Sequence, residues 1–263
     1  MRKNLYFLPL LSLLALLLLL PSPLSAAPGT LREFTGDFTP ATNGEKLLSL
    51  LVSLTDPETL ELHLDEEPDD RGNVRNMYFL VKGANVGGFR IERLALEASF
   101  VEFTPPSEWN PDGDDPIGVK NVLRSNIEAV ILERDINAAL AKASGDDWHG
   151  VSVDLKPGTI NARGYYTVKN PGLTLLAEVK TGLEIRRGKE LWLKDVLLKI
   201  NHDEQTNVVR DAIDEIQPVV DLRDFPFPVT LAVLSVDEET LRISTRTPPK
   251  AFSGITLGYR RGI

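Results

Sequence analysis

The segment Leu173-Thr-Leu-Leu-Ala-Glu-Val-Lys-Thr-Gly-Leu-Glu-Ile185 carries the clearest pattern in this 263-residue sequence. Its odd-numbered positions are apolar apart from Thr181, and charged residues stand between them at Glu178, Lys180 and Glu184. A period of two over thirteen residues is typical of a β-strand with one buried face. The segment therefore predicts a long strand over 173–185.

The residues that follow predict the partner strand of a hairpin. Residues 186–189 read as a turn, and apolar residues return at 191, 193, 196, 198 and 200. The apolar positions change parity at Lys194-Asp195, and a slip of one residue moves side chains to the opposite face of a sheet. We therefore predict a β-bulge at this point.

Alternation elsewhere predicts further antiparallel strands. They cover residues 60–64, 94–100, 127–131, 151–155, 160–166, 225–233 and 241–245. Lys156-Pro157-Gly158-Thr159 has the residues of a tight turn, so 151–166 is expected to be a hairpin. Pro226 and Pro228 place the start of the 225–233 strand at an edge.

Three short amphipathic helices are predicted at 45–54, 133–144 and 206–217. Thr42 and Glu45 have the spacing of a capping box at the start of the first. These helices can cover only part of the apolar sheet face. We therefore predict an α+β fold in which a long, strongly curved antiparallel sheet has an apolar concave face covered or plugged by the helices. The alternative is a solid core without a cavity, which alternation alone favours because most apolar strand faces are packed core.

The N-terminus has the three parts of a secretory signal peptide. Arg2 and Lys3 precede the apolar stretch 5–20, and small, turn-prone residues fill 21–27. The alternative is an uncleaved N-terminal anchor. We predict a signal peptide at 1–27, a mobile leader at 28–44, a single domain at 45–247 and a C-terminal tail at 248–263. The protein would then be exported, to the periplasm or the outer face of the cytoplasmic membrane.

Composition narrows the classes of function. The sequence is 42% hydrophobic and 25% charged, which is typical of a globular protein. It has 29 Lys and Arg against 38 Asp and Glu, a net charge of -9, which argues against nucleic acid as a partner. It has no cysteine, which excludes disulfides, thiolate metal sites and cysteine nucleophiles.

Motifs for catalysis and metal binding are weak or absent. The sequence has no G-x-S-x-G, H-E-x-x-H, Walker A or G-x-G-x-x-G motif. Its three histidines, His63, His149 and His202, have no local metal spacing. Residues 110–121 match the first ligand positions of a calcium loop but lack its glycine and final glutamate. We predict no enzyme activity, no cofactor and no metal.

The order of four segments resembles one known family. These are Gly83–Leu94, Leu132–Leu140, Val151–Gly164 and Val219–Leu231. In order and spacing they resemble the LmeA-like family of exported phospholipid-binding proteins, over about 45–247. The resemblance implies a fold akin to the tubular lipid-binding (TULIP-like) proteins, phospholipid in an elongated apolar tunnel and a role in the cell envelope. It brings no catalytic residues.

The pattern and the resemblance together predict a secreted cell-envelope protein that binds phospholipid or another acyl-chain lipid. It would act in lipid transport as a carrier or chaperone, with transient membrane contact. Helices 45–54 and 206–217 would be lids or, alternatively, fixed cover over the core. The predicted lipid-binding residues are Leu173, Leu175, Ala177, Val179, Leu183, Ile185, Val196, Leu198, Ile200, Phe225, Phe227, Val229 and Leu231. The rival prediction is an envelope scaffold with a solid core that binds proteins.

Overall fold

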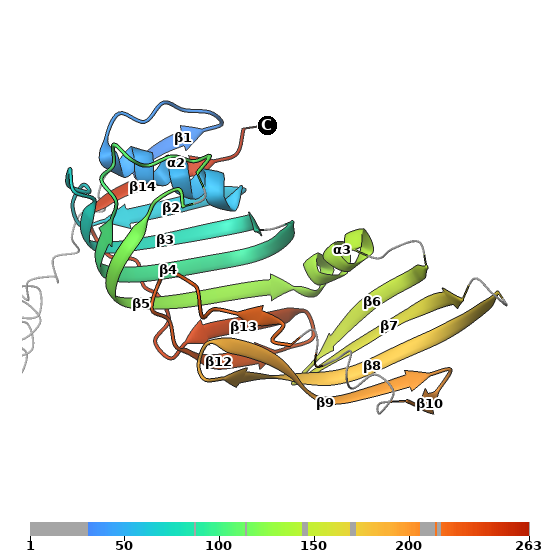
Figure 1. The fold of residues 1–263 in the computed structure, drawn as a ribbon. Helices are drawn as coiled ribbons and strands as arrows, with labels where there is room; N and C mark the ends of the chain where they lie inside the picture. The colour runs from blue at the N-terminus through green and yellow to red at the C-terminus, as the bar shows by residue number, and fades with distance from the viewer. Residues whose placement is uncertain are drawn as a thin grey trace, which may run out of the picture.

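The structure is a computed structural model that describes residues 31–86, 88–113, 115–143, 147–168, 172–205, 214 and 217–262. In this part of the chain the residues form two β-sheets and two helices (Figure 1). The predicted signal peptide at 1–27 lies outside the described residues. The predicted helix at 206–217 does too, apart from Asp214 and Gln217.

The larger sheet has eight strands in the order β1-β14-β2-β3-β4-β5-β13-β12. β1 and β14 pair in parallel, and the remaining neighbours are antiparallel. Its strands are β1 (Leu31–Thr35), β2 (Thr59–Leu64), β3 (Asn73–Val86), β4 (Phe89–Phe103), β5 (Val119–Leu132), β12 (Leu231–Val236), β13 (Thr240–Thr245) and β14 (Ile255–Arg260).

The second sheet contains the hairpin on which the sequence analysis began. Its order is β10-β9-β8-β7-β6, and β11 pairs with β9. The predicted bulge is confirmed, because the β8–β9 register shifts between Lys180 and Gly182 and Asp195 has a φ of 52°. The strands are β6 (Trp148–Lys156), β7 (Thr159–Val168), β8 (Leu173–Arg186), β9 (Glu190–Ile200), β10 (Asp203–Glu204) and β11 (Val220–Asp221).

Two of the predicted helices are present. α2 (Asn43–Thr55) packs on β2, β3 and β14 of the larger sheet (Figure 1). Its first turn is capped as predicted, since Thr42 Oγ1 accepts a 3.2 Å hydrogen bond from Glu45 N. α3 (Glu133–Ala143) follows β5 directly and connects the two sheets in sequence.

The prediction of one strongly curved sheet is wrong. The strands divide between two sheets: the chain leaves the larger sheet at α3, between β5 and β6, and returns to it at β12. Asn137 fixes α3 to the edge of β6, because its side chain donates to Val153 O at 2.9 Å and accepts from Val153 N at 2.6 Å. The edge of β6 is thereby occupied by a helix, so the larger sheet does not continue into β6.

The predicted strand at 225–233 is also wrong in its first half. β12 begins at Leu231, and residues 225–230 form no strand. Pro226 and Pro228 have no N–H to donate to a neighbouring strand, so this stretch cannot form a regular ladder despite its alternating apolar pattern.

Ordered strands also lie on both sides of 45–247. β1 belongs to the predicted leader and β14 to the predicted C-terminal tail, and the two pair with each other at the edge of the larger sheet. β14 continues the sheet by pairing with β2, and its Leu257 is buried. The exact limits of the domain stay a prediction.

Two apolar clusters hold the fold together. The first joins α2 to β2, β3, β4 and β14. The second joins the sheets to each other, because Val153, Leu183 and Leu191 of the six-stranded sheet pack with buried residues of β12 and β13. Backbone hydrogen bonds support this junction: Gly158 N donates to Val236 O, and Leu231 N to Gly188 O.

An apolar cavity as the candidate functional site

A cavity of about 620 Å³ lies on the face of the larger sheet that packs on α2. Alternation along three neighbouring strands builds its floor. Phe79, Leu96 and Ile127 form one cross-strand row, and all three line the cavity. Leu94, Ala129 and Ile243 form a second row that does the same.

Other elements complete the wall. α2 contributes Leu47, Leu51, Leu54 and Thr55, and the six-stranded sheet contributes Leu191. Phe225 and Phe227, whose ring centroids lie 5.7 Å apart, come from the irregular segment before β12. Asp115, Pro116 and Ile117 come from the loop between β4 and β5, so the cavity touches both sheets, one helix and two loops.

The lining residues are apolar except for Thr55 and Asp115. Both have local partners, since Thr55 Oγ1 donates to Leu51 O at 2.7 Å and Asp115 Oδ1 accepts from Gly118 N at 3.0 Å. A volume of this size lies within the roughly 300–1,000 Å³ of typical ligand pockets. The cavity is suited to an apolar ligand.

The lining residues are spread along β4. Phe89 and Phe103 stand at the two ends of β4, and both line the cavity. At about 3.3 Å per residue, the fourteen steps between them correspond to about 46 Å of strand. Three lining residues, Leu54, Val86 and Val220, are 42%, 44% and 37% exposed, so apolar side chains stand where the cavity meets solvent.

A cluster of ion pairs lies beside one end of the cavity. Arg90, the neighbour of Phe89, contacts Glu92 at 2.7 Å, Asp135 at 2.8 Å and Glu58 at 2.9 Å. The hydrogen bonds that the Arg90 guanidinium donates to Glu92 and Glu58 raise the pKa of Arg90 above its ordinary value. Because three carboxylates share this guanidinium, its role is to join β4 to α3 and to the loop after α2.

Few of the predicted lipid-binding residues line this cavity: Phe225, Phe227 and Leu231 do. Leu183 and Ile185 belong to the core that joins the sheets, and Val229 is also buried. Ala177 and Leu198 are buried within the six-stranded sheet, where Leu175, Val196 and Ile200 are partly buried. Val179 lines a second hollow, and Leu173 is 53% exposed. Their roles in lipid binding stay predictions.

Most of the cavity wall was not among the predicted binding residues. Leu94, Leu96, Ile127 and Ala129 sit in runs that the sequence analysis recognised as strands. Their alternation is shorter than that of 173–185, and no local signal says which strand face meets a helix. The signal that could have found them is the pairing of three such runs next to a leucine-rich helix.

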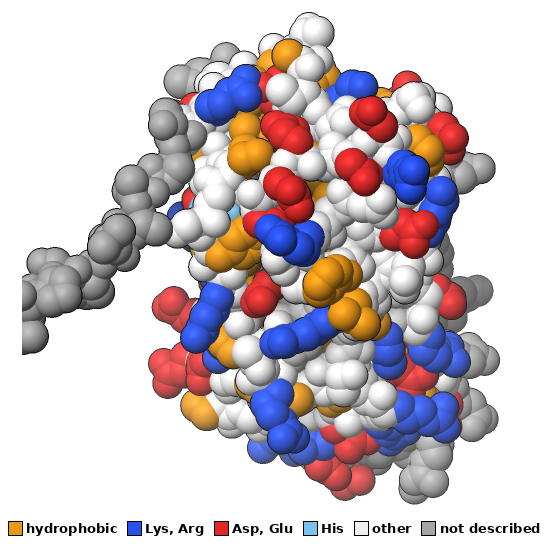
Figure 2. Space-filling model, turned by 90° about the vertical axis from the view of Figure 1, so that its left-hand side faces the viewer, with side chains coloured by type: hydrophobic (Ala, Val, Ile, Leu, Met, Phe, Trp, Pro, Cys, Tyr) orange, Lys and Arg blue, Asp and Glu red, His pale blue; other side chains and the backbone are white. Residues whose placement is uncertain are grey.

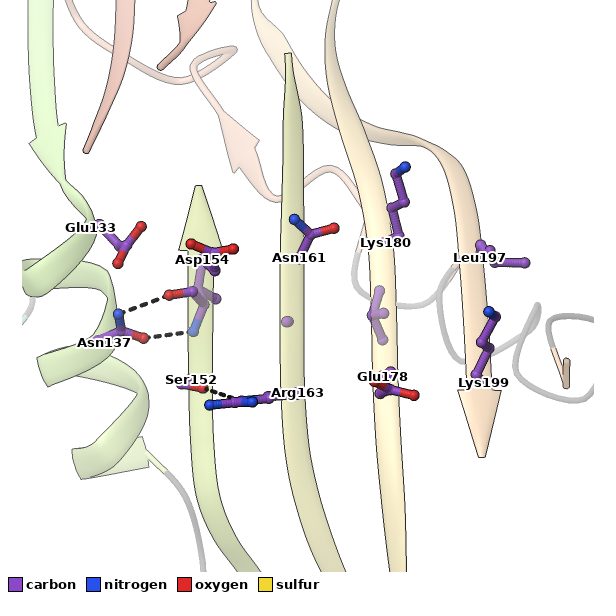
Figure 3. A pocket seen from close by; sticks show the side chains of 13 residues that line it. Glu133, Asn137, Ser152, Asp154, Asn161, Arg163, Glu178, Lys180, Leu197 and Lys199 are labelled. Atoms are coloured by element: carbon purple, nitrogen blue, oxygen red, sulfur yellow. Dashed lines mark hydrogen bonds between the residues drawn. The ribbon is translucent and has the colours of Figure 1, made fainter. Parts of the chain in front are cut away.

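The second hollow, of about 650 Å³, is a polar groove on the six-stranded sheet (Figure 3). Arg163 Nε on β7 donates to Ser152 Oγ on β6 at 3.4 Å. Lys180 and Lys199 project from β8 and β9. Its lining includes three acidic residues, Glu133, Asp154 and Glu178, and three basic ones, Arg163, Lys180 and Lys199. Such balanced charge is typical of a solvated sheet face, so the apolar cavity is the stronger candidate.

The histidine with the most partners lies away from both hollows. His63 Nε2 is 2.5 Å from Glu61 Oε1, and its Nδ1 is 3.3 Å from Thr256 Oγ1. Tyr78 and Phe252 flank the ring. Neither the apolar cavity nor the polar groove includes His63. Within the described ranges, no group of three or more histidines and carboxylates is placed to hold a metal ion.

Surface charge is mixed on the face drawn in Figure 2. Acidic and basic side chains alternate over it, and hydrophobic side chains form small separate groups. Neither described helix is long and apolar enough to cross a bilayer.

Together these features define an α+β protein with an apolar cavity. A family model described as LmeA-like phospholipid-binding matches residues 50–246, about three quarters of the chain. The chain therefore belongs to the LmeA-like phospholipid-binding family, as its sequence resemblance predicted. No curated protein and no solved structure matches it.

Proposed function

We propose that this protein is an exported cell-envelope protein that holds the acyl chains of phospholipid-like molecules in the apolar cavity. It acts as a carrier or chaperone, without catalysis. The observation that carries the proposal is the apolar cavity itself, with a wall built from both sheets and α2. Membership in a phospholipid-binding family supports the same ligand class.

The shape of the cavity suits acyl chains lying along the strands. A bilayer hydrocarbon core is about 30 Å thick, so the chains of one leaflet extend about 15 Å. The lined stretch of β4 exceeds that length. The headgroup would remain at an opening beside Leu54 and Val86 or beside Val220, because the interior offers it no polar partner.

The free energy of acyl-chain burial is compatible with exchange of a lipid between the protein and a membrane. Burying about sixteen methylene groups at about 0.8 kcal/mol each gives a gross gain of about 13 kcal/mol per chain. Most of this is already realised in the membrane that the lipid leaves, so the net affinity for the protein is modest. A carrier requires this balance, since it must release what it binds.

The predicted signal peptide at 1–27 supports export, with the periplasm or the outer face of the cytoplasmic membrane as the site of action. Membrane contact would be transient. The rival prediction, a scaffold with a solid core, receives less support because the larger sheet covers a cavity of about 620 Å³.

Native mass spectrometry with lipid extraction tests the proposal on the full chain purified from the envelope fraction. We expect a stoichiometric phospholipid, and we expect Phe227→Glu to remove it because a carboxylate in the cavity is costly to bury. Phe100→Glu is the matched control, since Phe100 is 58% exposed and lies outside the lining. A protein that carries no lipid and takes up none when it is added would contradict the proposal.

A further inference from the structure

At one end of the six-stranded sheet, formed by the start of β6, the end of β7 and the start of β8 and drawn at the far right of Figure 1, exposed apolar side chains gather beside a single described acidic residue, Asp147. Residues 164–168 and 173–177 include no charged side chain. Trp148, Tyr165 and Leu173 are 41%, 46% and 53% exposed there. We call these three residues, with Tyr166 and Leu175, the aromatic tip.

The aromatic tip presents apolar side chains on both faces of the sheet. Trp148, Tyr166 and Leu175 form one cross-strand row, and the rings of Trp148 and Tyr166 lie 5.2 Å apart. Tyr165 pairs with Leu176 in the adjacent row, which points to the opposite face. The face of Tyr165 also carries His149 and the Thr167–Thr174 pair, so the face of Trp148, Tyr166, Leu175 and Leu173 is the more apolar one. An exposed apolar cluster of this kind indicates an apolar partner.

Charged side chains begin two rows behind Tyr165, on the same face of the sheet. Arg163, Glu178 and Lys199 form that row, and Lys180 stands two rows further on. Trp and Tyr concentrate where a bilayer meets water, because their rings are apolar and their N–H or O–H groups remain hydrated. Lys and Arg extend their long side chains from such a position to lipid phosphates. Arg163, Lys180 and Lys199 could therefore stay in water or reach lipid phosphates when the tip is inserted.

The face that carries Trp148 continues as far as the cavity. The paired residues along it are apolar from Gly164 and Ala177, through Ala162, Val179 and Leu198, to Ile185 and Leu191, with Thr181 as the exception. Leu191 lines the apolar cavity. The aromatic tip and the candidate lipid site therefore lie on one apolar sheet face.

We propose that the aromatic tip docks this protein on a lipid bilayer by inserting Trp148, Tyr165 and Leu173 into the interfacial layer. The proposal rests on the proposed lipid-carrier function and names the surface through which the carrier meets the membrane. The opposite end of the molecule, drawn in Figure 2, carries interspersed charges and is not the docking end.

Vesicle flotation tests the proposal with the full chain and two probes, vesicles of phosphatidylcholine and vesicles that also contain phosphatidylglycerol. We expect wild-type protein to float with vesicles and Trp148→Glu or Leu173→Glu to reduce that fraction about tenfold or more. Leu123→Glu is the matched control for Leu173→Glu, because Leu123 is 70% exposed on the larger sheet. The control should float like wild type. Circular dichroism and thermal unfolding establish that each variant is folded.

A second measurement does not depend on a charged variant. Brominated phosphatidylcholine should quench the fluorescence of wild-type protein, and Trp148→Phe should remove the quenched component while keeping flotation. Wild-type protein that fails to float, tip variants that float unchanged, or quenching that survives Trp148→Phe would each overturn the docking proposal. Loss of a dimer in the Glu variants, measured by light scattering, would assign the tip to a second copy instead. In all these cases a co-purified lipid in the cavity would leave the carrier function standing.

Discussion

Leu191 of the six-stranded sheet and Ile243 of the eight-stranded sheet line the same apolar cavity, and both belong to the core that joins the two sheets. The cavity is therefore bounded partly by the junction between the sheets. Packing at this junction determines its width, so stability and ligand capacity are linked in this fold.

Filling the cavity should reduce lipid binding without unfolding the protein. Ala129 lies in the floor between Leu94 and Ile243, and Ala129→Phe would place a ring in the empty volume. In a packed core such a change costs about 1–3 kcal/mol, and in a cavity we expect less. Ala138→Phe on the exposed side of α3 is the control. Equal amounts of bound phospholipid in both variants would show that the ligand lies elsewhere.

Residues of β14 should contribute to global stability although they lie beyond 45–247. Leu257 is completely buried in the first core cluster. Leu257→Ala should lower the free energy of unfolding by about 2–5 kcal/mol, since it leaves a cavity in a packed core. Leu123→Ala, at an exposed position, should change it by no more than about 0.5 kcal/mol. Urea unfolding measures both, and similar values would mean that β14 is dispensable.

The contribution of the Thr42 cap of α2 to the free energy of unfolding should be measurable with single substitutions. Thr42 Oγ1 accepts from Glu45 N, so Thr42→Ala leaves that N–H without its partner and should cost about 1 kcal/mol. Thr42→Ser keeps the hydroxyl and should recover most of this loss. A serine variant no more stable than the alanine variant would assign the effect to the methyl group of threonine.

Asp65 should make stability depend on pH in the acid range. Burial raises the pKa of its carboxyl, but hydrogen bonds from Arg75 at 2.6 Å and from Asn76 outweigh burial and hold the pKa below its ordinary value. A lowered folded-state pKa stabilises the protein above the unfolded value of about 3.9, and this stabilisation is lost as pH falls through the folded value. Wild type should therefore exceed Asp65→Asn in stability at neutral pH, with the difference shrinking below about pH 4. A difference that stays constant in urea titrations, or one that Asp70→Asn reproduces, would contradict this assignment.

Local pattern predicted many of the regular elements, but β1, β3 and β14 of the larger sheet were not among the predicted strands. The period of two at 173–185 and the parity change at Lys194-Asp195 predicted β8, β9 and their bulge, because both features depend on backbone geometry within one hairpin. At 225–230 the same alternation misled, since Pro226 and Pro228 remove the donors that a ladder needs. The pairing of β1 with β14 joins segments more than 200 residues apart, and no local pattern reports it.

The position of the cavity depends on tertiary packing, which a local sequence pattern does not report. Val179 and Leu94 have similar alternating neighbours, yet Leu94 lines the apolar cavity and Val179 lines the polar groove. What separates them is the packing of α2 on the larger sheet, which is a tertiary contact. The sequence predicted an apolar, lipid-sized site of this type, and the family supports its ligand class, but alternation could not assign it to β3, β4 and β5.

Photo-crosslinking with a phospholipid that carries a diazirine in its acyl chain tests the central proposal most directly. The full chain would be loaded with this lipid, irradiated and mapped by peptide mass spectrometry. We expect crosslinks on residues of β3, β4 and β5 that line the cavity, such as Phe79, Leu94 and Ala129, and on Phe227. Crosslinks confined to the polar groove around Arg163, Lys180 and Lys199, or none above a soluble control protein, would contradict an acyl-chain site in the cavity.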